Sequence, residues 1–132
     1  MKNSLILMLT LASIIALTAC KKDKFADKPT QEKILGRWKF VSLTTEITMP
    51  PAPVQTNTEH GSEGDYFDFR TDGKLYWHIG GQEESYSYSI ANENMLIIDG
   101  ESYTIKELTE QKLVIEFVST TATRKQIYTL SR

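Results

Sequence analysis

Eight short stretches of the sequence alternate apolar and polar residues, and turn residues separate them. Alternation with a period of two is typical of β-strands that bury one face. Helical spacing extends over no more than a single turn, and no repeat of solenoid or propeller length occurs. The sequence therefore predicts an all-β fold with eight strands, over Arg37–Ile47, Tyr66–Arg70, Lys74–Ile79, Glu84–Ala91, Met95–Ile98, Ser102–Leu108, Lys112–Ser119 and Lys125–Ser131.

The turn between the second and third of these strands indicates their register. A two-residue Asp-Gly turn would place a polar residue, Asp68, opposite Trp77. A three-residue loop with Gly73 in the left-handed conformation pairs Phe67 with Trp77 instead. We predict the second register, because it gathers the apolar side chains of both strands on one face.

The connections between the strands indicate how the sheet is arranged. Eight strands with one apolar face each must bury those faces against one another, and closing the sheet into a barrel also removes its exposed edges. A two-layer sandwich would need several long crossing connections, and the sequence has only one, Met49–Gly64. We therefore expect an eight-stranded antiparallel up-and-down β-barrel, with residues 49–64 forming a long connecting loop.

The first strand begins with Gly36-Arg37-Trp38, after a predicted helical turn over Gln31–Leu35 that Thr30 would cap. This Gly-x-Trp resembles the start of the first strand in lipocalins and fatty-acid-binding proteins. The resemblance implies that the short helix closes the bottom of the barrel and that Trp38 lies across its floor. It also implies that an arginine at the end of the last strand, here Arg132, packs on the ring, which contributes about 0.5 to 2 kcal/mol.

The resemblance is closest to the small lipocalin-like domains of bacterial lipoproteins, and it covers residues 31–132. The sequence lacks the C-terminal helix, the disulfide and the middle Thr-Asp motif of typical lipocalins. Its strands are also shorter. The resemblance implies a ligand-binding barrel, and these departures leave the size of its cavity open.

The N-terminal segment resembles a lipoprotein signal. Lys2 precedes an apolar run, Leu5–Ala16, that is shorter than the roughly 20 residues needed to span a bilayer. Leu17-Thr18-Ala19-Cys20 resembles the lipobox of bacterial lipoproteins, in which the cysteine becomes the lipidated first residue. The alternative is a secretory signal followed by an incidental free cysteine. We expect a signal peptide over residues 1–19 and a lipid anchor, such as palmitate, on Cys20.

The next segment, residues 20–30, is polar and is predicted to be a flexible tether before the barrel domain at 31–132. Cleavage would leave 132 minus 19, or 113 residues, which fits one domain. The start of the tether, Lys21-Lys22-Asp23-Lys24, partly resembles a signal that directs lipoproteins to the outer face of the outer membrane in Gram-negative bacteria. That resemblance implies a membrane-anchored protein of the cell envelope, exposed at the surface.

Charge and motifs argue against several other functions. Loss of Lys2 with the signal would leave 14 basic and 17 acidic residues, scattered singly, which does not favour nucleic acid as a partner. The two histidines, His60 and His78, are not at metal-ligand spacing, and no phosphate-binding loop or nucleophile elbow occurs. We expect a monomer that is not an enzyme and needs no cofactor or metal.

The predicted inward positions carry many aromatic residues. An eight-stranded barrel is either just filled by side chains or able to hold one small ligand, and the sequence allows both. Four of the rings are phenols, which need hydrogen-bond partners when buried, and this favours a small hydrophobic or amphipathic ligand. The candidate ligand-binding residues are Phe40, Phe67, Phe69, Trp77, Tyr86, Tyr88, Tyr103, Phe117 and Tyr128.

The outer face suggests an alternative function. Tyr66, Tyr76 and His78 alternate with the inward residues and are predicted to face outward. They would suit an envelope protein whose filled barrel binds another protein or a glycan. The alternative interpretation is purely structural: outward aromatic residues commonly pack against side chains of the neighbouring strands and form no binding surface.

Overall fold

The computed structural model describes residues 24–132, so the predicted signal peptide and Cys20 lie outside the described residues. This part of the chain forms one short helix and nine strands that belong to a single antiparallel sheet. The elements are α1 (Thr30–Ile34), β1 (Gly36–Ile47), β2 (Gln55–His60), β3 (Tyr66–Phe69), β4 (Lys74–Ile79), β5 (Gln82–Asn92), β6 (Met95–Ile98), β7 (Glu101–Leu108), β8 (Lys112–Val118) and β9 (Arg124–Ser131).

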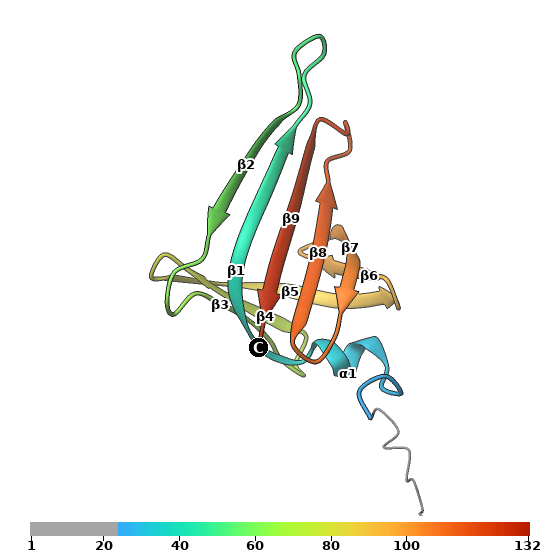
Figure 1. Cartoon of the computed structure of the whole chain (residues 1–132). Helices are drawn as coiled ribbons and strands as arrows, with labels where there is room; N and C mark the ends of the chain where they lie inside the picture. Colours follow the sequence, from blue (N-terminus) through green and yellow to red (C-terminus); the bar gives the residue numbers. More distant parts are fainter. Residues whose placement is uncertain (1–23) are drawn as a thin grey trace, which may run out of the picture.

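The sheet closes because the first and last strands of the sequence pair with each other. Neighbouring strands follow chain order from β3 to β9, and β1 pairs with both β3 and β9. The β1–β9 register runs from Lys39 opposite Ser131 to Ile47 opposite Arg124. The predicted eight-stranded antiparallel barrel is therefore confirmed, with β2 as an additional strand (Figure 1).

The additional strand lies in the segment 49–64, which the sequence predicts to be a loop. All six residues of β2 are polar and exposed, so they show no alternation that could reveal a strand. β2 pairs with Ser42–Ile47 of β1, beyond the part of β1 that pairs with β3. The loop prediction is wrong for residues 55–60, because backbone pairing along the free edge of β1 forms this strand. The β1–β2 hairpin projects beyond the rest of the barrel (Figure 1).

The β3–β4 hairpin has the predicted register. Phe67 lies opposite Trp77, and Phe69 lies opposite Leu75. Gly73 has a φ of +77°, the left-handed conformation that glycine adopts readily. The side chains of these four residues belong to the core or pack against it. The three-residue loop is therefore the one that allows all four to be buried on the same face.

A bulge in β1 separates its barrel part from its projecting part. Phe40 lies opposite Leu130, whereas the next paired residue, Ser42, lies opposite Thr129. The extra residue, Val41, is 37% exposed. Bulges bend and twist a strand, which fits the change of partner from β3 to β2 at this point.

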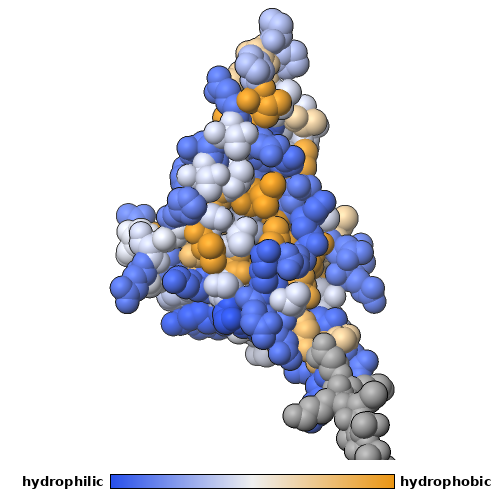
Figure 2. Space-filling model, viewed as in Figure 1, coloured by the Kyte–Doolittle hydropathy of each residue, from blue (hydrophilic) through white to orange (hydrophobic). Residues whose placement is uncertain are grey.

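On the face of the molecule that carries β1, β9 and β8, apolar side chains lie among polar ones (Figure 2).

The helix begins one residue earlier than predicted and has a different cap. Pro29 is the N-cap residue, and no side chain caps α1. The Thr30 hydroxyl instead donates a hydrogen bond to the backbone oxygen of Glu93, at 3.2 Å. The capping role predicted for Thr30 is therefore wrong, because a distant turn between β5 and β6 provides an acceptor for its side chain.

The described end of the predicted tether is folded as a turn over residues 24–28. The Lys28 amide donates to the backbone oxygen of Phe25 at 3.1 Å. The Lys33 ammonium of α1 lies 5.5 Å from the centroid of the Phe25 ring. This part of the chain thus packs beside α1.

The core fills the inside of the barrel, and β5 contributes only partly buried side chains to it, Tyr86, Tyr88 and Ile90. Each of the other barrel strands contributes buried residues. With one residue from α1, the buried apolar set is Ile34, Trp38, Phe40, Phe67, Phe69, Leu75, Leu96, Ile98, Tyr103, Ile105, Leu113, Ile115, Tyr128 and Leu130.

Candidate binding site at the open end of the barrel

Trp38 lies across the closed end of the barrel and is fully buried. Its Nε1 donates to the backbone oxygen of Ile34 in α1, at 2.8 Å. The Arg132 guanidinium lies 3.9 Å from the centroid of the Trp38 ring, so the two residues that the resemblance pairs are in contact. Gly36 has a φ of +102°, which lets the chain turn from α1 into β1 beside them.

Arg132 also satisfies backbone groups at the end of α1. Its Nη2 and Nη1 donate to the carbonyl oxygens of Lys33 and Leu35, at 3.0 and 2.8 Å. Carbonyls at a helix end lack partners within the helix, so the arginine supplies the missing donors. Burial lowers the pKa of Arg132, but a guanidinium remains charged at neutral pH. The contacts of Arg132 are those of a structural residue.

All nine aromatic candidates for ligand binding lie in the core or against it. Rings contact one another both on adjacent strands and across the barrel: the centroids of Phe67 and Trp77, on β3 and β4, are 4.2 Å apart, and those of Trp77 and Tyr128, on β4 and β9, are 5.3 Å apart. The rings therefore fill the middle of the barrel. The buried members are Phe40, Phe67, Phe69, Tyr103 and Tyr128, and the partly buried members are Trp77, Tyr86, Tyr88 and Phe117.

Two of the four inward phenols have protein partners. The Tyr88 hydroxyl donates to the backbone oxygen of Arg70 at 2.7 Å. The Tyr86 hydroxyl donates to the carboxylate of Glu84. This hydrogen bond, together with burial, raises the pKa of Tyr86 to about 12. Both phenols are neutral at physiological pH.

The other two phenols, Tyr103 and Tyr128, make no hydrogen bond to any residue from 24 to 132. Their side chains are enclosed, since the residues are only 7% and 5% exposed. Their hydroxyl oxygens nevertheless keep some solvent access, because neither belongs to the fully buried polar atoms without partners. Burial raises the pKa of both residues, so both stay protonated. Two hydrogen-bonding groups at the accessible side of an apolar cluster thus lack partners among the described residues.

Comparison with known proteins agrees with this architecture. The model of a family described as a lipocalin-like domain matches residues 34–115, which is more than half of the chain. The chain belongs to the lipocalin-like family. Among solved structures, a bovine odorant-binding protein, a deswapped triple mutant, is similar with 14% sequence identity and a TM-score of 0.42, over 76% of this chain and 74% of that chain. No curated protein matches the sequence.

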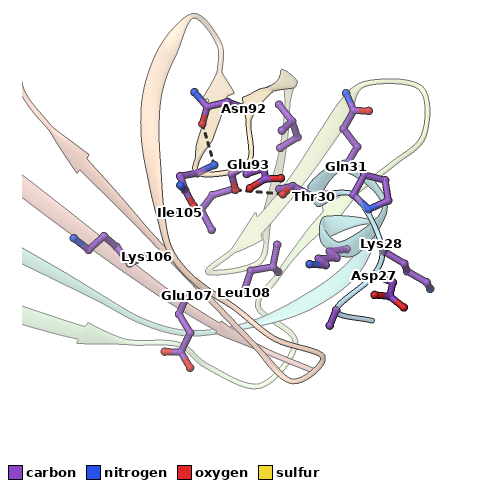
Figure 3. Close-up of a pocket in the computed structure, with 15 residues that line it drawn as sticks. Asp27, Lys28, Thr30, Gln31, Asn92, Glu93, Ile105, Lys106, Glu107 and Leu108 are labelled. Carbon is purple, nitrogen blue, oxygen red and sulfur yellow. Dashed lines mark hydrogen bonds between the residues drawn. The ribbon is translucent and has the colours of Figure 1, made fainter. Parts of the chain in front are cut away.

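Two open cavities of the lipocalin-like domain lie outside the aromatic cluster. The larger, of about 750 Å³, lies between α1 with its preceding turn, the β5–β6 turn and β7, and charges of both signs surround it (Figure 3). The other, of about 550 Å³, is lined by residues that include Arg37, Lys39 and Tyr66. None of the nine aromatic candidates lines either cavity.

Asp65 is a buried carboxylate that no sequence motif marks. It is 6% exposed and accepts hydrogen bonds from the backbone amides of Ser62 and Gly80, at 2.8 and 2.9 Å. These bonds lower the pKa of Asp65. Asp65 thereby ties the β2–β3 connection to the β4–β5 turn. The spacing of Ser62 and Asp65 could indicate a local turn, but only the fold brings Gly80 to the same carboxylate.

The outer aromatic residues are engaged with neighbouring strands. Tyr66 and His78 stack with centroids 5.0 Å apart, and the Arg37 guanidinium lies 3.9 Å from the centroid of Tyr66. Arg70 lies over Tyr76 at the same distance, 3.9 Å. These contacts are the cross-strand packing that provides a structural explanation for outward aromatic residues.

The histidines lie apart from the aromatic cluster. His60 is exposed in β2, and the buried Nδ1 of His78 has no hydrogen-bond partner. Within residues 24–132, no group of three or more histidine, cysteine and acidic side chains could hold a metal ion. The helix in this range is too short to cross a membrane.

Proposed function

We propose that this lipocalin-like domain is a carrier that binds one small hydrophobic or amphipathic ligand at the open end of its barrel, without catalysing a reaction. The observation that carries the proposal is the pair of enclosed hydroxyls on Tyr103 and Tyr128, which have no partner among the described residues. Because both hydroxyls keep some solvent access, water can satisfy them in the ligand-free protein. A ligand with polar atoms would replace that water and form hydrogen bonds to the two hydroxyls.

The ligand would lie on the aromatic cluster rather than deep inside it. The rings in the middle of the barrel are in contact, so they leave little room there. Trp77, Phe117 and Leu43 are only partly buried, and they offer apolar surface to a ligand. The β1–β2 hairpin projects past the end of the barrel (Figure 1) and would form one wall of the site.

Native mass spectrometry of the protein purified from its own host tests this proposal. We expect a retained small molecule in the wild type and its loss in the double variant Tyr103→Phe, Tyr128→Phe. Tyr76→Phe removes a phenol from the outer face and is the matched control, which should keep the molecule. Retention by the double variant would show that the two hydroxyls do not bind it.

The proposal also includes a lipid anchor on Cys20, in the outer membrane of a Gram-negative bacterium and exposed at the surface. The support is the lipobox-like sequence Leu17-Thr18-Ala19-Cys20 and the charged residues after it. The described chain begins beside α1, at the closed end, so an anchor just before it would leave the open end facing away from the membrane (Figure 1). Labelled palmitate should be incorporated by the wild type and not by Cys20→Ser. Equal labelling of both would overturn the anchor.

A second candidate function is an envelope module that binds a protein or a glycan. One observation favours it: β2 pairs with β1 alone, so its other edge presents free backbone groups to a partner strand. Crosslinking in intact cells separates the two functions. Capture of a specific protein through β2, with no small molecule retained, would favour the module.

A further inference from the structure

Three carboxylates lie on the inward face of the strands around the aromatic cluster. Glu59 of β2 is opposite Leu43, and Glu84 of β5 is opposite Trp77. In an antiparallel pair, residues directly opposite each other point to the same face, and both Leu43 and Trp77 pack against the core. The two glutamates therefore lie on the face of the sheet that carries the core side chains, where both are exposed to solvent.

The third carboxylate follows from the same argument. Glu101 of β7 is opposite Ile98, which is buried, and it precedes the inward Tyr103 by two residues. These acids belong to three different strands, β2, β5 and β7, which are not neighbours in the sheet. Only the closure of the barrel brings these three acids to the same end of the aromatic cluster.

These acids interact with the phenols of the site. Glu84 accepts the hydrogen bond from the Tyr86 hydroxyl. Burial is the main cause that raises the pKa of Tyr128, and the charges of Glu101 and Glu59 raise it further. The acids and the unpartnered hydroxyl of Tyr128 therefore face the same space, from different elements.

Few cations face the same space. By register, Lys39, Lys74, Lys112 and Lys125 point outward, since each adjoins an inward residue on its strand. Arg132 faces inward but is held at the closed end by carbonyl oxygens. Arg124 is opposite Ile47 at the far tip of β1 and β9, where it is exposed. Among the described charged residues placed here by register, those facing the aromatic cluster are thus mostly carboxylates.

We infer that the ligand of this site carries a positive charge and is an alkylamine or a quaternary ammonium compound. Its apolar part would lie on Leu43, Trp77 and Phe117, and its charged group would lie among the carboxylates and phenols. Aromatic faces also attract cations, which adds to the preference. An anionic amphiphile would meet like charges there. This inference rests on the proposed function, because it names the chemical class that the same site takes.

Calorimetric titration of the full chain with three probes of one chain length tests the inference. The probes are octylammonium, octan-1-ol and octanoate, each below its aggregation concentration. We expect octylammonium to bind about tenfold more tightly than octan-1-ol, since partly exposed charge and cation–π contributions each amount to a few-fold, and octanoate to bind most weakly. Raising the salt concentration should reduce this preference, because salt screens charges.

A pair of variants with equal net charge separates the local carboxylates from the charge of the whole protein. The first replaces the inward acids: Glu59→Gln, Glu84→Gln and Glu101→Gln. The control replaces acids elsewhere: Glu32→Gln, Glu63→Gln and Glu116→Gln. We expect the first variant to lose the preference for octylammonium, and the control to keep it.

The possible outcomes distinguish this inference from the proposed function. Equal binding of all three probes, or a preference for octanoate, would overturn the positive charge and leave a carrier of amphipathic ligands. Binding of none of the probes would overturn the carrier and the inference together. A preference for octylammonium that survives in the first variant would overturn the role of the three acids.

Discussion

At the closed end of the barrel, Arg132 donates three hydrogen bonds to backbone carbonyls, whereas at the other end the hydroxyls of Tyr103 and Tyr128 donate none within the described chain. Both ends are rich in aromatic residues. At the closed end, the Trp38 nitrogen and the guanidinium above it both have partners in the protein. The closed end thus satisfies its polar groups within the described chain, whereas the open end leaves two hydroxyls available to the ligand that we propose.

The two ends of the barrel also differ in the charged groups that they carry. At the closed end, the positive charge of Arg132 is held by carbonyl oxygens. Toward the open end, Glu59, Glu84 and Glu101 face inward on separate strands, and the cation that shares this face lies at the exposed tip. Stability and binding are therefore expected to depend on different residues, and substitutions can separate them.

The largest effect on stability is expected at the closed end. Trp38→Ala should lower the free energy of unfolding by about 3 to 5 kcal/mol, because it removes a fully buried indole. Arg132→Ala should lower it by about 1 to 3 kcal/mol through loss of charged hydrogen bonds and the ring contact. Urea denaturation of both variants, with the partly buried Trp77→Ala as the control, measures this. Free energies of unfolding equal to that of the wild type in both variants would remove the structural role of the pair.

A smaller loss is expected where the β1–β2 hairpin meets the barrel. A Cβ atom added at Gly61 would lie 2.1 Å from the backbone oxygen of Phe40, so the backbone must shift. We expect Gly61→Ala to lower the free energy of unfolding by about 1 to 3 kcal/mol. Gly64→Ala is the control, since a Cβ there meets no atom within 4 Å, although its φ of +90° is unfavourable for alanine. A variant Gly61→Ala as stable as the wild type would show that this junction adapts freely.

Asp65 should make the open end sensitive to acid. Its pKa is lowered in the folded protein by the amides of Ser62 and Gly80. A carboxylate with a lowered pKa stabilises the fold above its unfolded pKa, about 3.9, and this stabilisation disappears as the pH falls through the folded value. The melting temperature of the wild type should exceed that of Asp65→Asn by a constant margin from pH 5 to 8, and the margin should shrink below about pH 4. A margin independent of pH would contradict this account.

The smallest effect on stability is expected for the unpartnered phenols. Tyr88→Phe removes a hydroxyl that donates to Arg70 and should cost about 1 kcal/mol. Tyr103→Phe and Tyr128→Phe remove no protein hydrogen bond, so each should change stability by less than about 0.5 kcal/mol. Thermal denaturation without ligand compares the three variants. A loss at Tyr128→Phe as large as that at Tyr88→Phe would indicate a partner for its hydroxyl in the ligand-free protein.

Much of the barrel could be predicted from residue patterns, because burial of one face imposes alternation on each strand. The register of the β3–β4 hairpin followed from matching Phe67 with Trp77, and the structure confirms it. β2 could not be predicted in this way, since its six exposed residues carry no signal of burial. The cap of α1 was missed for a related reason: the acceptor for Thr30, Glu93, is 63 residues away.

For the candidate site, the sequence could indicate which aromatic residues point inward but not which hydroxyls find partners. Tyr88 has one because its hydroxyl reaches the backbone of Arg70, 18 residues before it. Asp65 was missed because its partner Gly80 belongs to a different turn. Hydrogen bonds between distant segments depend on tertiary geometry, which alternation does not encode.

The sequence by itself determined the strand pattern, the inward set of aromatic residues and the contact between Trp38 and Arg132, since these follow from local spacing and from a family motif. Only the tertiary structure decided that the aromatic rings pack together inside the barrel, that two phenols lack partners among the described residues and that acids from three strands share one face. The reason is physical. Packing and electrostatic fields arise from the distances between segments, and those distances are set only when the sheet closes.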